Sequence, residues 1–71
     1  MEAISIQSEY ITLGQFLKLI SLISSGGQAK FFLLDNNVLV NNEEEKRRGR
    51  KLYHNDIIYV ANKEYQIYVP K

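Results

Sequence analysis

The chain has 71 residues, a formal net charge of +1 and no cysteine, with 45% hydrophobic and 24% charged residues. We expect residues 1–71 to form one small globular domain, with no disulfide or thiolate metal site and little room for a deep catalytic cleft. No apolar segment is typical of a signal peptide or reaches the roughly 20 residues that span a bilayer, so we expect a soluble cytoplasmic protein without membrane contact.

The first half of the chain predicts a strand and two helices. Residues 3–7 alternate in polarity, which is typical of a short edge strand. Residues 13–23 follow Thr12, a favourable N-cap, and their apolar side chains recur at helical spacing. The serines and glycines of residues 24–27 end this helix, and residues 28–35 form a second, shorter one.

The second half predicts strands separated by turns. Residues 38–40 alternate in polarity, and residues 52–60 and 63–69 are rich in β-branched and aromatic side chains. The predicted order is therefore one strand, two helices and three strands. Because asparagine tolerates the left-handed conformation, we expect it at three sharp turns, at Asn36, Asn42 and Asn55. The residues expected in the core are Leu13, Phe16, Leu17, Ile20, Ala29, Phe32, Leu33, Val38, Val40, Ile57 and Val60.

Residues 46–51, the basic segment, hold five of the nine lysines and arginines of the chain and follow three glutamates at 43–45. Such a run is either a solvated surface loop or a binding site for something anionic. The glutamates lack the spaced oxygen donors of a metal site, so we expect a solvated turn there. His54 is the single histidine and has no evident nucleophile beside it. Since no phosphate loop occurs either, an enzyme is the least favoured interpretation.

Residues 25–42, SGGQAKFFLLDNNVLVNN, resemble the signature of the RNA-binding domain named after ribosomal protein S-four. Residues 55–60, NDIIYV, are similar to a further strand motif of this family, with Asp56 as its aspartate. The segments ITLGQFLK, SGGQAK and RRGRKLY occur here in the order found in small stand-alone bacterial members, and the resemblance covers nearly the whole chain. The chain departs from many members at Thr12 and Gly14, where they carry arginine and aspartate.

This resemblance implies an α+β fold in which two short helices pack on a small, mainly antiparallel sheet. It also implies a non-catalytic protein without a cofactor that binds structured RNA such as ribosomal RNA, with the ribosome or ribosomal proteins as further partners. Free backbone N–H groups of Gly26, Gly27 and Gln28, at the start of the second helix, would meet a phosphate, and the glycines would let the RNA backbone approach closely. A flexible cationic arm would be formed by Arg47, Arg48, Arg50 and Lys51. The implied RNA-binding residues are Lys18, Gly26, Gly27, Gln28, Lys30, Arg47, Arg48, Arg50 and Lys51.

Two alternatives stay open. One is a protein-interaction module without nucleic acid, in which the acidic and basic halves of residues 43–51 meet complementary charges on a partner. The other concerns the tyrosines, which could stack on bases as in single-strand binders, although strand alternation favours packing on the sheet for most of them. Tyr53, beside the basic segment, is the tyrosine we single out as a candidate for stacking.

Overall fold

The computed structural model describes residues 1–70, in which seven short strands accompany two α-helices and one 3-10 helix. In chain order these are β1 (Glu2–Ser5), β2 (Tyr10–Thr12), α1 (Leu13–Leu19), η1 (Gly26–Gln28), α2 (Ala29–Asp35), β3 (Leu39–Val40), β4 (Glu43–Glu44), β5 (Lys51–Tyr53), β6 (Ile57–Val60) and β7 (Lys63–Tyr68). Strands β1, β7, β6, β3 and β4 form one sheet in that order, and β2 pairs with β5 in a separate ribbon. Among the described strands only the β1–β7 pairing is parallel, which confirms an α+β fold with a mainly antiparallel sheet.

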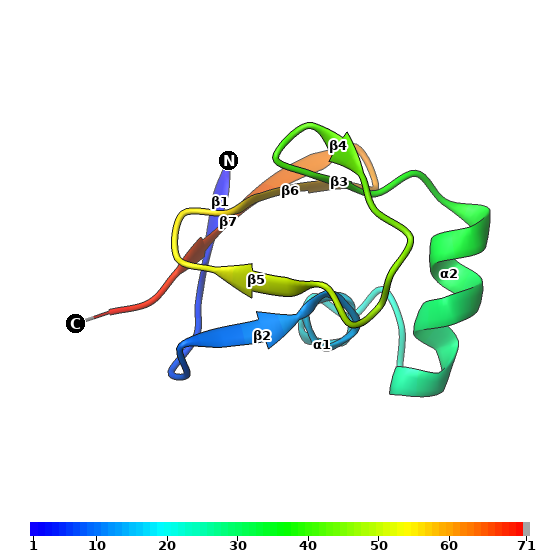
Figure 1. The fold of residues 1–71 in the computed structure, drawn as a ribbon, viewed down its shortest axis with the longest axis horizontal. Helices are drawn as coiled ribbons and strands as arrows, with labels where there is room; N and C mark the ends of the chain where they lie inside the picture. The colour runs from blue at the N-terminus through cyan, green and yellow to red at the C-terminus, as the bar shows by residue number, and fades with distance from the viewer. Residues whose placement is uncertain (71) are drawn as a thin grey trace.

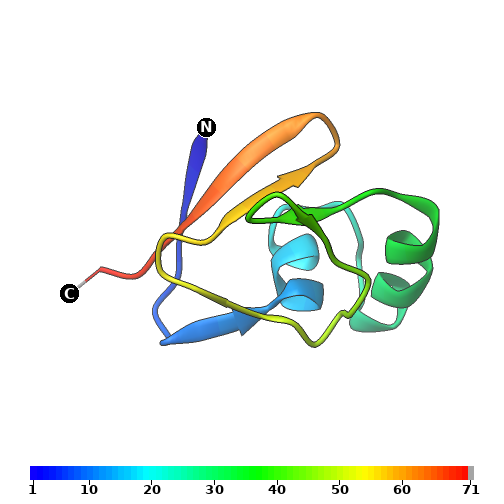
Figure 2. The same cartoon turned by 45° about the horizontal axis from the view of Figure 1, so that its top comes forward.

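The two helices lie toward one end of the molecule. Figure 1 shows α2 outermost, with α1 between it and the strands, and Figure 2 shows the same arrangement after rotation. Each α-helix spans seven residues. Within residues 1–70 no helix is both long enough and apolar enough to cross a membrane. The predicted first strand is confirmed as β1, which lies at the edge of the larger sheet.

Local hydrogen bonds define both ends of α1. Thr12 is the N-cap, as predicted: its Oγ1 accepts a hydrogen bond from Gln15 N at 3.2 Å, and Gln15 Oε1 accepts one from Thr12 N at 2.9 Å. The helix ends at Leu19, earlier than predicted, because Ser21 takes a left-handed φ of 67°. The N–H groups of Ser21 and Leu22 donate to carbonyl groups of the preceding turn, which is the Schellman arrangement. Glycine usually holds this position, so a serine there gave no signal of the helix end.

More strands form than the sequence predicts. The sequence indicates neither β2 nor β4. The segment 52–60, which the sequence predicts as one strand, contains parts of two strands, β5 and β6. Asn42 and Asn55 take left-handed φ values of 70° and 74°, as predicted. The prediction is wrong for Asn36, whose φ is −133°. Its side-chain Nδ2 instead donates to Phe32 O at 2.9 Å, so this asparagine ends α2 through a side-chain hydrogen bond.

The core lies between α1, the start of α2 and the inner faces of the strands. Its buried apolar residues are Ile6, Leu13, Phe16, Leu17, Ile23, Ala29, Leu33, Val38, Val40, Leu52, Ile58, Val60, Tyr65 and Ile67. Most predicted core positions are confirmed, but Ile57 is wrong, because its neighbour Ile58 is fully buried instead. Ile58 pairs with Tyr65 of β7, and this register turns Ile58 rather than Ile57 inward. Ile20 and Phe32 are half-buried against the core.

Candidate nucleic-acid interface

The basic segment connects β4 to β5 and passes the N-terminal end of α1 (Figure 1). Two backbone hydrogen bonds attach it there. Leu13 N donates to Arg50 O at 2.8 Å, and Gly14 N donates to Arg48 O at 2.9 Å. These bonds satisfy two N–H groups of the first helical turn, which have no partner within the helix. The first helix therefore fixes the path of the basic segment.

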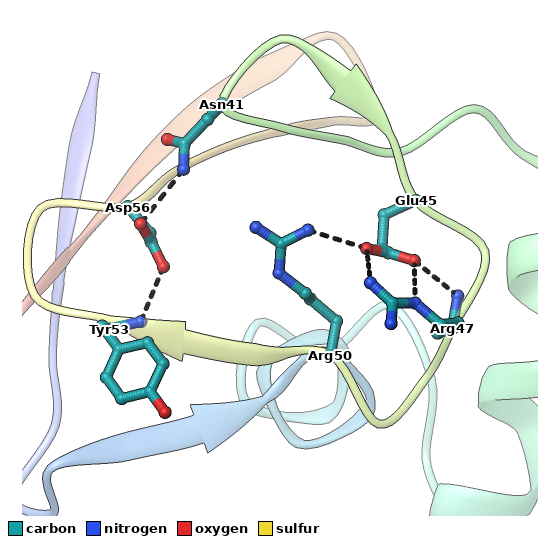
Figure 3. A network of polar contacts seen from close by, with 6 residues as sticks. All are labelled: Asn41, Glu45, Arg47, Arg50, Tyr53 and Asp56. Carbon is teal, nitrogen blue, oxygen red and sulfur yellow. Dashed lines mark hydrogen bonds and ion pairs between the residues drawn. The ribbon is translucent and has the colours of Figure 1, made fainter.

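Glu45 precedes the basic segment and is buried, with only 6% of its surface exposed. Arg47 Nε and Nη2 donate to its two carboxylate oxygens, both at 3.0 Å, and Arg50 Nη1 donates at 2.8 Å (Figure 3). Hydrogen bonds from Arg47 lower the pKa of Glu45 most, burial opposes them, Arg50 lowers it further, and the pKa falls from 4.5 to about 2. The expected solvated turn is thus wrong for Glu45, which is a buried and ionised carboxylate.

This pairing changes the role of two arginines. The Arg50 side chain is 29% exposed, whereas the Arg47 side chain is 73% exposed. Contact with Glu45 also raises the pKa of Arg47 above its ordinary value. The prediction of a flexible arm is wrong for both residues, because each is held by a carboxylate from the same connection. We refer to these three residues as the Glu45 cluster.

Lys46, the first cation of the basic segment, is held by the end of α2. Its Nζ donates to Leu33 O at 2.6 Å and to Asn36 O at 3.3 Å, and it lies 3.8 Å from a Glu44 carboxylate oxygen. A cation at the carbonyl end of a helix satisfies orphan acceptors and interacts favourably with the helix dipole. Lys46 therefore has a structural role.

The remaining cations of the basic segment face solvent. Arg48 is exposed, and its side chain makes no hydrogen bond or ion pair with residues 1–70. Lys51 is exposed on β5, and its Nζ lies 5.0 Å from the centre of the Tyr10 ring. The structure thus separates this segment into cations that the protein itself holds and cations that are free to meet a ligand.

Three of the predicted residues in the helical region, Lys18, Gly26 and Gln28, line two surface hollows that each include a residue of η1. One hollow, of about 510 Å³, places Lys18 beside Gln28. The other, of about 270 Å³, places Gly26 beside Arg48 and is bordered by the start of α1. Lys30 and Gly27 are both exposed nearby in sequence. Residues from three separate segments therefore meet around η1. The predicted site residues that line neither hollow are Gly27, Lys30, Arg47, Arg50 and Lys51.

Gln28 takes part in the local fold of this region. Its backbone N–H donates to Ser25 O at 3.1 Å, and its Oε1 accepts hydrogen bonds from Ser24 N at 2.7 Å and Ser24 Oγ at 3.0 Å. The Gln28 N–H is therefore already occupied, which corrects the expectation that it is free for a phosphate. In contrast, space is open around the position that a side chain would take at Gly26 and Gly27.

The motif residues Asn41 and Asp56 have a structural explanation. Asn41 Nδ2 donates to Asp56 Oδ1 at 3.1 Å, and Asn41 Oδ1 accepts from Ile57 N at 2.9 Å. Asp56 Oδ2 accepts from Tyr53 N at 2.8 Å (Figure 3). These bonds join the turn after β3 to the turn between β5 and β6. His54 is similarly structural, because its Nδ1 accepts a hydrogen bond from Val69 N at 3.0 Å.

Two features of this surface were missed in the sequence. The sequence does not indicate that Glu45 is buried, because residues 43–45 are three identical glutamates beside the same basic segment. Tyr10 was missed because β2 is only three residues long. The β-branched and aromatic residues of YIT were the available signal for that strand.

Comparison with known proteins agrees with this architecture. A family model described as the S4 domain matches residues 4–68. The chain therefore belongs to the S4 domain family, the family that its motifs resemble. It is also similar to the probable ribosome maturation protein RlbA of Bacillus subtilis (strain 168), with 60% identity over 55 residues that cover 78% of each chain.

Proposed function

We propose that this protein is a non-catalytic RNA-binding protein that binds structured RNA, such as ribosomal RNA, on the surface around η1. The observation that carries the proposal is the meeting of Lys18, Gln28, Gly26 and Arg48 around one short helix, although they come from three separate segments. Membership of the S4 domain family supports the proposal. The name of the similar RlbA supports a ribosomal target, which would place the protein in the cytoplasm.

We assign the phosphate contacts to Lys18 and Arg48, which line the two hollows, and to the exposed lysines outside them, Lys30 and Lys51. Arginine can hold a phosphate through two parallel hydrogen bonds, and Arg48 has no competing partner among the residues that the structure describes. Gly26 and Gly27 contribute open space in which the RNA backbone can approach.

The Glu45 cluster contributes to the same surface in a different way. Arg47 is exposed enough to reach a phosphate while it stays bonded to Glu45. The side chain of Arg50 is mostly buried. It fixes the position of the basic segment through its bond to Glu45, and only a small part of it is accessible to RNA. Contacts of this kind fix the position of RNA without reading bases, so the shape of a folded RNA is the proposed basis of recognition.

The protein-interaction alternative has less support. In it, the charges of residues 43–51 would pair with complementary charges on a partner. Glu45 and two arginines already satisfy one another, and Lys46 is bonded to the end of α2. Fewer charges of this run are therefore available for a protein partner than the sequence indicates.

The test is a salt titration of binding to purified bacterial ribosomal RNA. The variant carries Lys30→Gln, Arg48→Gln and Lys51→Gln, which leave the Glu45 cluster intact. If each cation neutralises one phosphate, the slope of log affinity against log salt should shrink by roughly 2–3, at about 0.7 per contact for a single strand and about 0.9 for a duplex. The matched control is Lys63→Gln, an exposed lysine at the start of β7, which should leave affinity and slope unchanged.

The melting temperature shows whether each variant stays folded. A folded triple variant with the affinity and salt slope of the wild type would contradict the proposed function. That result would favour the protein-interaction alternative.

A further inference from the structure

The β2–β5 ribbon has one buried and one exposed face. Its register pairs Ile11 with Leu52, and Leu52 is fully buried while Ile11 is half-buried. Because side chains alternate along a strand, the residues on either side of these two point away from the core. The outward side chains of the ribbon are Tyr10, Thr12, Lys51 and Tyr53.

Two tyrosines occupy the end of this exposed face. Tyr10 and Tyr53 are directly opposite each other in the register, and their ring centres lie 5.6 Å apart at an interplanar angle of 46°. The tilt leaves part of each ring uncovered, and the residues are 37% and 43% exposed. Aromatic surface is among the most favourable to bury, so a paired but uncovered set of rings is available to stack with a further planar group.

A cation lies directly beside the rings. Lys51 Nζ is 5.0 Å from the centre of the Tyr10 ring, which is within the range of a cation–π contact. Lys51 is also the last residue of the basic segment, two residues before Tyr53 on the same strand. Along a strand that separation is about 6–7 Å. The aromatic pair is therefore a continuation of the cationic surface proposed to bind RNA.

The other exposed tyrosines have different surroundings. Tyr59 is 42% exposed, and its hydroxyl lies 3.5 Å from Asn62 Oδ1. Tyr68 is 48% exposed, and its ring lies 5.5 Å from the His54 ring. Within residues 1–70 no cation–π contact involves either of them. Exposure alone thus does not distinguish the ribbon; the combination of two rings with a lysine does.

We propose that Tyr10 and Tyr53 form a stacking platform for an unpaired nucleobase, and that Lys51 holds the phosphate next to it. This proposal rests on the proposed RNA-binding function and deepens it by naming the RNA element: a bulged or looped-out nucleotide within a folded RNA. A base presents a free face to an aromatic side chain only when it has left the helical stack. Rings combined with positive charge are the means by which proteins bind single-stranded segments without reading their sequence.

The test uses tryptophan as a reporter, because the chain contains none. In Tyr53→Trp, the fluorescence of the new side chain should be quenched by an RNA hairpin that carries a bulged adenosine. The same hairpin without the bulge should quench it much less. Tyr59→Trp is the matched control, because Tyr59 has the same exposure but no adjacent cation, and it should respond equally to both hairpins.

Affinity for the bulged hairpin provides the second measurement. Tyr53→Leu should weaken binding by roughly ten-fold, whereas Tyr53→Phe and Tyr53→Trp, which keep a ring, should stay close to the wild type. Melting temperatures confirm that the variants are folded. Retention of affinity in the ring-keeping variants shows that a loss in Tyr53→Leu comes from stacking.

The outcomes separate the two proposals. If Tyr53→Leu binds as the wild type does and Tyr53→Trp is quenched equally by both hairpins, the stacking platform is overturned. The proposed RNA-binding function would still stand if the Lys30, Arg48 and Lys51 triple variant lost affinity for ribosomal RNA. If the wild type bound neither ribosomal RNA nor either hairpin, both proposals would fall.

Discussion

The basic segment contains two pairs of cations in contrasting environments. Arg47 and Arg50, the inner pair, are bonded to the buried carboxylate of Glu45, whereas Arg48 and Lys51, the outer pair, have no carboxylate partner within residues 1–70. The four residues lie within five positions of one another and look equivalent in the sequence. The difference teaches that the number of cations in a basic run exceeds the number that can bind an external anion. Some of the cations pair with an internal carboxylate, here Glu45, and hold the segment in place.

This contrast also affects how the protein should be tested. Joint substitution of all three arginines would remove both partners of Glu45 together with the exposed Arg48. Loss of binding in that variant would have two causes that the experiment does not separate, a damaged fold and a lost contact with RNA. Substitutions confined to one of the two pairs avoid this problem, and they also test whether the two pairs differ in function.

Acidification should produce the largest effect on the inner pair. The folded-state pKa of Glu45 is about 2, below its ordinary value of 4.5. Its contribution to stability is therefore fully present above pH 4.5 and is lost as the pH falls from 4.5 toward about 2. The loss should be at most about 3 kcal/mol. It is measured by denaturant unfolding of the wild type and Glu45→Gln across this range.

The difference in stability between these two proteins should shrink as the pH falls, because Glu45 of the wild type becomes protonated. The other carboxylates titrate in both proteins and therefore cancel in the comparison. A difference that stays constant from about pH 6 to about pH 2 would show that Glu45 is not held ionised by its arginines.

Arg50→Gln should be the next most destabilising change. It leaves a buried carboxylate with one arginine instead of two, at an expected cost of about 2 kcal/mol. Urea unfolding measures this, with Arg48→Gln as the matched control. In the double variant with Glu45→Gln the two effects should not add, because the residues share one interaction. Equal stability of the Arg50 and Arg48 variants would remove the distinction between the inner and outer pairs.

Arg47→Gln should have a smaller effect than Arg50→Gln. Although Arg47 makes two side-chain hydrogen bonds to Glu45, most of its side chain is in water. Solvent screens such a pair, so the expected loss of stability is smaller than that of Arg50→Gln, and it should diminish in high salt. Unfolding measured at low and high ionic strength checks both statements. A loss larger than that of Arg50→Gln would reverse the order of the two arginines.

Arg48→Gln should have the smallest effect on stability, within about 0.5 kcal/mol, because its side chain has no hydrogen bond or ion pair to lose among residues 1–70. Its effect on RNA binding, in contrast, should be measurable. The salt slope of binding to ribosomal RNA should fall by about 0.7–0.9, the share of one phosphate contact in a single strand or a duplex. Lys63→Gln is the control for a general change of charge. A stability loss without a change of slope would place Arg48 with the inner pair.

Much of the helical region could be predicted from local sequence. The Thr12 capping box and the spacing of Leu13, Phe16 and Leu17 indicate where α1 begins and which face it buries. Its end could not be predicted, because Ser21 adopts a conformation that glycine usually supplies. For the candidate site, the helix and loop residues were named from motifs, but their separation into structural and exposed cations was not. That separation depends on a carboxylate whose burial only the folded chain reveals.

By itself, the sequence determined the helix start, the turns at Asn42 and Asn55 and the motifs of the S4 domain family. These depend on hydrogen bonds and backbone angles within a few residues of chain, so their signals are local. The tertiary structure alone decided that Ile58 rather than Ile57 faces inward and that Glu45 is enclosed with its arginines. It also decided that Tyr10 meets Tyr53. Each of these results depends on strand register and burial between segments far apart in the chain, which polarity patterns do not specify.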